Sequence, residues 1–198
     1  MLRPEYPLRT ERLTLRPFAP ADFDDLYAIR SRPDVTRYLY DEPESPAQVR
    51  DVLNRKIGES TLDDAGQGIS LAVVLPQIDC VIGEVHLQWL NREHRQGEIG
   101  FVINPDHHGN GFATEAADVA LRLGFDGLGL HRIIGRLDGR NLGSARVLEK
   151  LGMRCEAHFV HDEFFKGEWS DQLVYAILDT EWYPATRTSR RAIRPRPC

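Results

Sequence analysis

The stretch HHGNGFATEA, His107 to Ala116, places two glycines immediately before a segment whose apolar residues have helical spacing. Glycine costs a helix roughly 1 kcal/mol relative to alanine, so Gly109 and Gly111 indicate a need for bare backbone. A glycine-rich turn that opens a helix presents unpaired N–H groups at the positive end of the helix dipole. This arrangement favours a phosphate site. An ordinary loop that uses glycine in its turns is the alternative interpretation.

A dinucleotide-binding fold is another way to use such glycines. Its fingerprint, G-x-G-x-x-G, starts directly after a strand. Here Thr114 occupies the third glycine position, and NPDHH separates the preceding strand from the first glycine. An acidic residue, Asp138, does follow the next strand. The pattern nevertheless favours a phosphate site of another fold.

Two helices are predicted in the first third of the chain. ADFDDLYAIRS, residues 21–31, has apolar residues at helical spacing, and Pro33 is expected to end this helix. The segment SPAQVRDVLNRKIGE begins with Ser45 as the expected N-cap. Pro46 then takes the first helical position and Gln48 completes a capping-box pattern.

The remaining segments predict a mixed, mostly antiparallel sheet of about six or seven strands with helices on both faces, an α/β (α+β) fold. Three successive strands with short turns predict an antiparallel meander. The predicted element order is β-α-α-β-β-β-α-β-α-β-β. The expected strands are 12–18, 69–75, 80–90, 97–103, 131–138, 154–165 and 170–178, and the further helices are 113–129 and 144–152.

Length and composition predict one domain. A chain of 198 residues suits a single well-buried core, so we expect a domain over 8–183 and an Arg-rich, disordered tail over 184–198. A net charge of -5 gives no reason to expect a nucleic-acid binder, although the tail's arginines could attract one. The acidic body weakly favours cationic substrates such as amines. No apolar run is long enough to span a membrane, and three scattered cysteines predict a cytoplasmic setting.

The segment EIGFVINPDHHGNGFATEA resembles the signature of the GNAT superfamily of acetyl-CoA-dependent N-acetyltransferases. The family's Q/R-x-x-G-x-G/A pattern is matched by residues 108–113, with His108 in place of Gln or Arg. Three more stretches resemble the RimJ/RimL-type branch, which acetylates ribosomal-protein N-termini. They are LRTERLTLRPF, LHRIIGRLDGRNLGSARVLEKLGM and FFKGEWSDQLVYAIL. The resemblance spans roughly residues 8 to 182 and implies the GNAT fold.

The resemblance implies acetyl-CoA as the cofactor. It implies that backbone amides from Gly109 to Thr114 bind the pyrophosphate, and that the pantetheine arm lies along the strand at Phe101 to Ile103. An N–H near Phe101 or Val102 would then stabilise the negative charge on the carbonyl oxygen. The implied cofactor-binding residues are Phe101, Val102, Ile103, His108, Gly109, Asn110, Gly111, Phe112, Ala113, Thr114, Asn141 and Ser144.

The implied catalytic residues are Glu98, Ser144, Asn141 and His86. In relatives the Asn contacts the pantetheine and the Ser lies near the thioester sulfur, where it can supply a proton. Local sequence alone predicts that Asn141 is a turn residue and Ser144 a helix N-cap. Glu98 is our first choice for the general base, through a bound water, and Glu84 and His86 are its rivals. No ligand spacing indicates a metal.

The resemblance implies an enzyme that moves an acetyl group to a primary amine by direct attack in a ternary complex. The acceptor can be a protein N-terminal α-amine or a small molecule, and the motifs do not separate these. A non-catalytic acyl-CoA-binding or sensing module of the same fold is the alternative. The resemblance also leaves a homodimer open.

Overall fold

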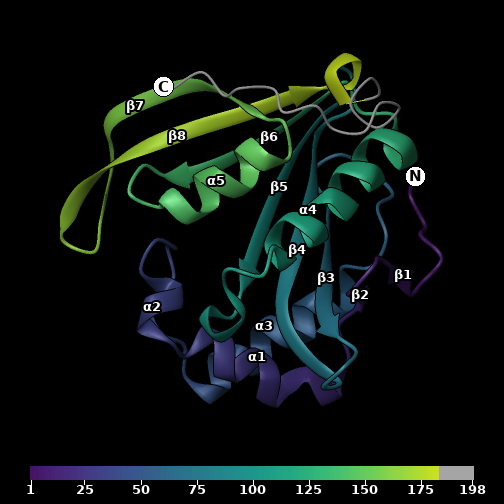
Figure 1. The fold of residues 1–198 in the computed structure, drawn as a ribbon, viewed down its shortest axis with the longest axis vertical. Helices are drawn as coiled ribbons and strands as arrows, with labels where there is room; N and C mark the ends of the chain where they lie inside the picture. The colour runs from purple at the N-terminus through teal and green to yellow at the C-terminus, as the bar shows by residue number, and fades with distance from the viewer. Residues whose placement is uncertain (183–198) are drawn as a thin grey trace.

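The computed structural model describes residues 1–182, and the tail predicted over 184–198 lies outside the described residues. One eight-stranded sheet, in the order β1-β2-β3-β4-β5-β6-β8-β7, forms the centre of the described part (Figure 1). Its neighbouring strands are antiparallel except for the parallel pair β5 and β6. The strands are β1 (Leu8–Arg9), β2 (Thr14–Pro17), β3 (Gly68–Leu75), β4 (Cys80–Asn91), β5 (Gln96–Ile103), β6 (Arg132–Asp138), β7 (Arg154–Phe165) and β8 (Glu168–Leu178).

The predicted mixed sheet with a β3–β4–β5 meander is confirmed. The eighth strand, β1, was not predicted because two residues are too short to show alternation. The α-helices are α1 (Phe23–Arg30), α2 (Pro33–Thr36), α3 (Pro46–Gly58), α4 (Phe112–Arg122) and α5 (Leu142–Lys150). Helix α1 ends before Pro33, as predicted, but short α2 was missed, and Pro33 takes its first position.

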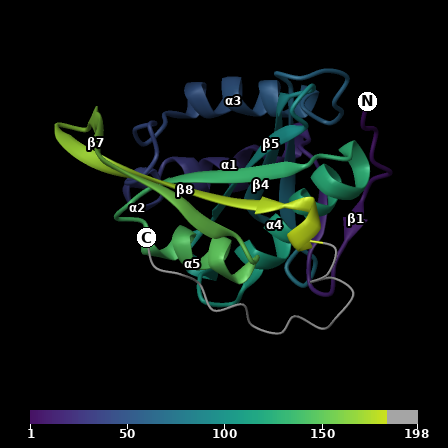
Figure 2. The same ribbon diagram turned by 90° about the horizontal axis from the view of Figure 1, so that it is seen from above.

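The helices cover both faces of the sheet, as predicted (Figure 2). One hydrophobic cluster joins α1 and α3 to the sheet through Leu26, Val49 and Leu53. The larger cluster includes buried residues of α4 and α5 on the other face. Strand β3 contributes to both clusters by alternation, for example with Val73 and Val74. It is therefore buried on both sides, which explains its mostly apolar sequence, in which Ser70 is the polar exception.

Helix α3 begins as its sequence predicts. Ser45 is the N-cap, its backbone N–H donates to Gln48 Oε1 at 2.9 Å, and the Gln48 N–H approaches Ser45 Oγ at 3.5 Å. This capping box satisfies donors that the first turn leaves free. It fixes the start of a helix whose other end supplies Lys56 and Glu59 to the site described below.

Strands β5 and β6 separate after a short contact. Their parallel register covers only Gln96 to Glu98 against Arg132 to Ile134, and the two strands then diverge (Figure 1). Strand β4 stays paired with β5 as far as Ile103. The second half of β5 therefore borders a gap in the middle of the sheet. None of the helices in the described residues is long and apolar enough to cross a membrane.

Candidate active site

A cavity of about 620 Å³ lies where β5 and β6 separate. Its walls come from β4, the second half of β5, β6, the start of α4, α5 and the segment around α2. Of the residues implied to bind the cofactor, all but Asn110 line it: Phe101, Val102, Ile103, His108, Gly109, Gly111, Phe112, Ala113, Thr114, Asn141 and Ser144. The fold thus brings together residues from two segments about 30 positions apart.

The two glycines at the start of α4 have left-handed backbone conformations. Gly109 has a φ of +78° and Gly111, the N-cap of α4, a φ of +81°. Residues with a Cβ rarely adopt this conformation. A Cβ added at Gly109 would meet nothing within 4 Å, so the backbone there is open to an approaching group. The glycines are needed for the shape of the turn, which leaves the first amides of α4 facing the cavity region.

Polar side chains hold this turn in place. His108 donates from Nε2 to the carbonyl of Ile103 at 2.8 Å, which ties the turn to the end of β5. Asn110 donates from Nδ2 to the carbonyls of His107 and His108, each at 3.1 Å. The structure thus shows His108 bracing the backbone in the position where the family pattern has Gln or Arg.

Arg12, just before β2, supports the turn in a way that was not predicted from the sequence. Its Nη1 donates to the carbonyl of Asn110 at 2.8 Å, and its Nε donates to Glu115 Oε2 at 2.8 Å. The guanidinium also lies 4.7 Å from the centroid of the Phe112 ring. The ion pair with Arg12 offsets the charge of Glu115, which lies in the first turn of α4. Arg12 belongs to the quoted LRTERLTLRPF stretch, but nothing in that stretch alone indicates its partner.

Asn141 is the N-cap of α5, which corrects the local prediction that Ser144 is the N-cap. The Asn141 side chain caps the helix by accepting from the Ser144 N–H at 3.1 Å. Ser144 is the third helical residue, and both side chains line the cavity. Asn141 therefore caps the helix in place of the predicted Ser144, because its side-chain oxygen accepts from the amide of the third helical residue.

Glu98 and Glu84 both form ion pairs. Arg136 on β6 holds Glu98 through two nitrogens, with Nε 3.1 Å from Oε1, and Glu98 does not line the cavity. Glu84 does line it, and is paired with Lys56 Nζ at 2.7 Å and Arg30 Nη1 at 3.3 Å. Burial opposes ionisation of Glu84, but these two cations outweigh it and hold the pKa of the carboxyl below its usual value.

His86 lines the cavity on β4, directly opposite Gly100 of β5. Burial and the nearby charge of Lys56 lower the pKa of its imidazole, against the opposing effect of Glu59, Glu84 and Glu98. The ring is therefore neutral at neutral pH, as a base must be before it accepts a proton. Its Nδ1 lies 3.1 Å from the hydroxyl of Ser70.

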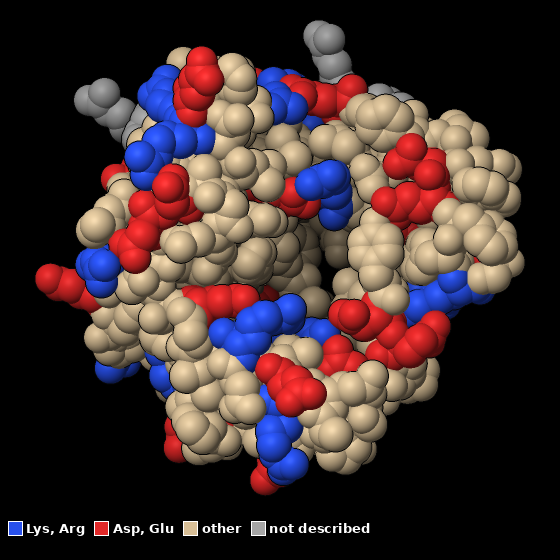
Figure 3. All heavy atoms as spheres, turned by 180° about the vertical axis from the view of Figure 1, so that it is seen from behind, with Lys and Arg blue, Asp and Glu red and all other residues tan. Residues whose placement is uncertain are grey.

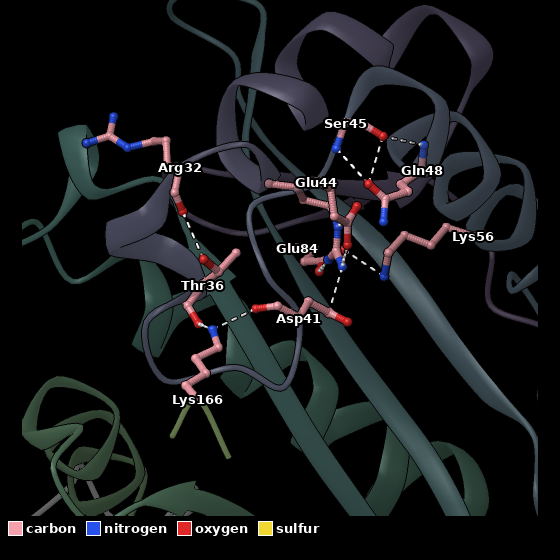
Figure 4. Close-up of polar contacts among 10 residues, drawn as sticks. Arg32, Thr36, Asp41, Glu44, Ser45, Gln48, Lys56, Glu84 and Lys166 are labelled. Carbon is pink, nitrogen blue, oxygen red and sulfur yellow. Dashed lines mark hydrogen bonds and ion pairs between the residues drawn. The ribbon is translucent and has the colours of Figure 1, made fainter. Parts of the chain in front are cut away.

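The turn between β7 and β8 is joined to the last residue of α2 and to the segment that follows it (Figure 4). Lys166 donates from Nζ to the carbonyls of Thr36 and Asp41 at 2.6 and 2.8 Å. Tyr40 adds a hydrogen bond to Glu163 and a ring contact with Phe165, 5.7 Å between centroids. We call this set of contacts the β7–β8 latch. It borders the cavity wall that is formed by Asp34, Val35, Tyr38 and Leu39.

The molecule is hollowed on the face seen in Figure 3, where a deep opening has both acidic and basic side chains near its rim. The charges near the cavity are largely paired, as the Glu84 and Glu98 contacts show. Among the described residues, no group of three His, Cys, Asp or Glu side chains is placed to hold a metal ion.

Comparison with known proteins identifies the class. The sequence profile of the acetyltransferase (GNAT) domain family matches residues 12–154. The chain is 33% identical to the uncharacterized N-acetyltransferase YnaD of Bacillus subtilis over 175 residues, which cover 88% of this chain and 98% of that protein. The chain belongs to the GNAT acetyltransferase family. It is an N-acetyltransferase, and the predicted fold is confirmed.

Two solved structures of the family are similar to this chain. A GNAT-family acetyltransferase from Bacillus anthracis has a TM-score of 0.78 and 32% identity, with 88% of this chain and 99% of that chain covered. Spermidine N-acetyltransferase from Vibrio cholerae, in a complex with CoA and spermine, has a TM-score of 0.74 and 27% identity, with 88% and 99% covered. These relatives do not bear out the narrower resemblance to the RimJ/RimL-type branch.

Acetyl-CoA is the cofactor of this family, and the residues of this chain fit it. The open backbone at Gly109 leaves room for a diphosphate beside the amides of α4. The second half of β5 has no strand partner on the β6 side, and before the Ile103 carbonyl, which His108 engages, its edge can pair with an extended arm. When bound there, acetyl-CoA supplies an acyl thioester that an amine can attack.

Proposed function

We propose that this protein acetylates a primary amine of a small molecule, by direct attack in a ternary complex with acetyl-CoA. The observation that carries the proposal is one continuous cavity lined by both the glycine turn and His86. A diphosphate held at the turn and an amine held at His86 would meet along the second half of β5. A site that only sensed the cofactor would not need a neutral imidazole in that place.

The β7–β8 latch supports a small acceptor rather than a protein N-terminus. Lys166 donates to two carbonyls of the segment that forms one wall of the cavity, so the latch ties the β7–β8 turn to that wall. We infer that this tie keeps the wall close to the cavity, which suits a slender amine better than a peptide chain. The Vibrio cholerae relative, crystallised with CoA and spermine, supports an acceptor of the polyamine type. A ribosomal-protein N-terminus, the acceptor of RimJ/RimL-type enzymes, is the second candidate because of the quoted motifs.

Each residue then has a defined part. Amides from Gly109 to Thr114 bind the diphosphate, and the backbone at Phe101 to Ile103 holds the pantetheine arm. Asn141 and Ser144 border the arm from α5, where Ser144 can donate a proton to the departing sulfur. His86 replaces Glu98 as our first choice for the general base, because Arg136 already engages both carboxylate oxygens of Glu98. The homodimer and the cytoplasmic setting stay predictions.

The test is a panel of acceptors with acetyl-CoA, in which free thiol and acetylated product are both measured. The panel contains spermidine, spermine, short diamines, single amino acids and tetrapeptides with free N-termini. We expect kcat/KM to be highest for one of the small amines. Faster acetylation of the tetrapeptides would overturn the small-acceptor proposal. Tight acetyl-CoA binding with thiol release at the hydrolysis background for every acceptor would favour the non-catalytic alternative.

A further inference from the structure

Three polar residues form a hydrogen-bonded chain that ends at His86. Glu59 directly follows α3, Ser70 lies on β3, and His86 lies opposite Ser70 on β4. Ser70 Oγ lies 3.1 Å from His86 Nδ1, and the same hydroxyl donates to the Glu59 carboxylate. The Ser70 N–H also donates to the Glu59 carbonyl at 2.8 Å, which fixes the two residues relative to each other. Ser70 is 1% exposed.

The number of protons available in this hydrogen-bonded series determines the tautomer of His86. An ionised carboxylate only accepts hydrogen bonds, and a serine hydroxyl has one proton to give. That proton goes to Glu59, so Ser70 Oγ must accept from His86. The imidazole therefore carries its proton on Nδ1 when neutral, and Nε2 keeps a free lone pair.

Two glycines shape the surroundings of the His86 ring: Gly68 makes room for the ring itself, and Gly100 leaves space beside it. A Cβ added at Gly68 would lie 2.3 Å from Cε1 of His86 and 2.9 Å from Nε2, so the ring rests against β3 at a position that only glycine allows. On the other side, a Cβ added at Gly100 would meet nothing within 4 Å. Gly100 is the β5 partner of His86, and both residues line the cavity. An acceptor nitrogen can thus occupy the space over Gly100.

The charged groups around the His86 ring come from α3 and the residue that follows it, from β4 and from β5. Lys56 of α3 disfavours the imidazolium, whereas Glu59, Glu84 of β4 and Glu98 of β5 favour it. Lys56 is paired with Glu84, and Glu98 with Arg136, so these charges are partly cancelled. Glu59 is the carboxylate connected to His86 through a hydroxyl. It is placed to compensate a positive charge that forms on the ring.

We propose that Ser70 and Glu59 are positioning residues that hold His86 in the Nδ1–H tautomer, so that Nε2 removes the proton from the acceptor's ammonium group. The N–H electron pair stays on the acceptor nitrogen, which becomes the neutral nucleophile. The imidazolium keeps its Nδ1–H directed at Ser70 and later gives the Nε2 proton to water. The proposal rests on the proposed function, since it requires an amine acceptor at this site.

The first experiment reads the tautomer without any turnover. Long-range ¹H–¹⁵N spectra of the whole protein at pH 7 distinguish the two neutral forms of an imidazole, and His86→Gln identifies which of the seven histidines gives the signal. We expect Nδ1–H in the unaltered protein and a mixture or Nε2–H in Ser70→Ala. Ser170→Ala, at a buried serine of β8 that hydrogen-bonds the Glu163 carbonyl, is expected to leave the His86 signal unchanged. An Nε2–H signal in the unaltered protein would overturn the proposal even if the enzyme is active.

The second experiment uses the best acceptor from the panel. We expect His86→Gln to lower kcat/KM by roughly 10²-fold or more, the usual contribution of a general base. We expect Ser70→Ala and Glu59→Gln to lower it by about 10-fold or more and to shift the acidic limb of the pH profile, with KM for acetyl-CoA unchanged. Ser70→Thr, which keeps the hydroxyl, should restore most of the rate. Unchanged rate and pH profile in folded Ser70→Ala would overturn the positioning role. An inactive unaltered protein would instead count against the proposed function.

Discussion

At the scale of single residues, the turn at Gly109 and Gly111 could be predicted because glycine is unfavourable in a helix, and these two glycines directly precede one. The contacts that support the turn could not be predicted. Arg12 lies 98 positions before the Asn110 carbonyl that it binds, and Ser70 reaches His86 only after β3 and β4 pair. Such contacts depend on how the strands are aligned, and this alignment cannot be read directly from a single sequence.

Gly109→Ala tests the turn at this scale. Alanine in a left-handed conformation costs about 1 kcal/mol or more, and its Cβ would point into open space where the diphosphate is expected. We predict an increase in KM for acetyl-CoA of at least several-fold, measured by steady-state kinetics. Gly66→Ala is the matched control, with a φ of +91° and equally open space. If both variants raised KM equally, the diphosphate would not contact Gly109.

Lys56→Met tests the buried charges next to His86. The side chains of Lys56 and Glu84 are 9% and 12% exposed, and losing one partner of a buried pair typically costs about 3–5 kcal/mol. We predict that the free energy of unfolding falls by an amount near the low end of this range at pH 7, because Arg30 still faces Glu84. Urea unfolding measures it.

The pH dependence of that loss has a defined sign. The pKa of Glu84 is lowered in the folded protein, so the stabilisation is present above the usual carboxyl value of 4.5 and lost as the pH falls below it. Without Lys56 the carboxyl keeps its proton to higher pH. The difference between Lys56→Met and the unaltered protein should therefore shrink on acidification. A difference that grew below pH 5 would contradict the ion pair.

At the scale of elements, periodicity and caps identified most strands and helices correctly, since each element has a regular pattern of buried residues. The prediction was wrong for elements that tertiary contacts define, such as β1 and α2. The order of β6, β8 and β7 in the sheet, and the gap between β5 and β6, have no local sequence signal. For the cofactor half of the candidate site, the sequence predicted individual lining residues, because glycines indicate the backbone conformation there. For the acceptor half, it predicted only three alternative general bases.

Asn141→Ala tests whether α5 acts in the site as well as in the fold. Loss of an N-cap typically costs about 1 kcal/mol of unfolding free energy, so Asn141→Ala and Ser45→Ala should destabilise the protein similarly in urea unfolding. Asn141 lines the cavity and Ser45 does not. We therefore expect a higher KM for acetyl-CoA in Asn141→Ala alone. An unchanged KM would restrict Asn141 to its structural role.

At the scale of the whole molecule, the cofactor is expected to join both halves of the split sheet. A ligand that binds only the folded protein stabilises it by about 2.7 kcal/mol at 100 times its Kd. We predict a rise in Tm with acetyl-CoA concentration that follows this relation, measured by scanning calorimetry. Gly109→Ala should need more acetyl-CoA for the same rise. A concentration-independent Tm would contradict binding between the two halves.

The measurement that tests the central claim most directly is a titration of the ¹⁵N-labelled protein with acetyl-CoA, followed by amide NMR. We predict saturable binding with the largest amide shifts from Gly109 to Thr114 and from Phe101 to Ile103. Little change is predicted at the start of α3, including Ser45. Absence of binding, or saturable binding whose shifts leave the amides of residues 109–114 unchanged, would contradict it.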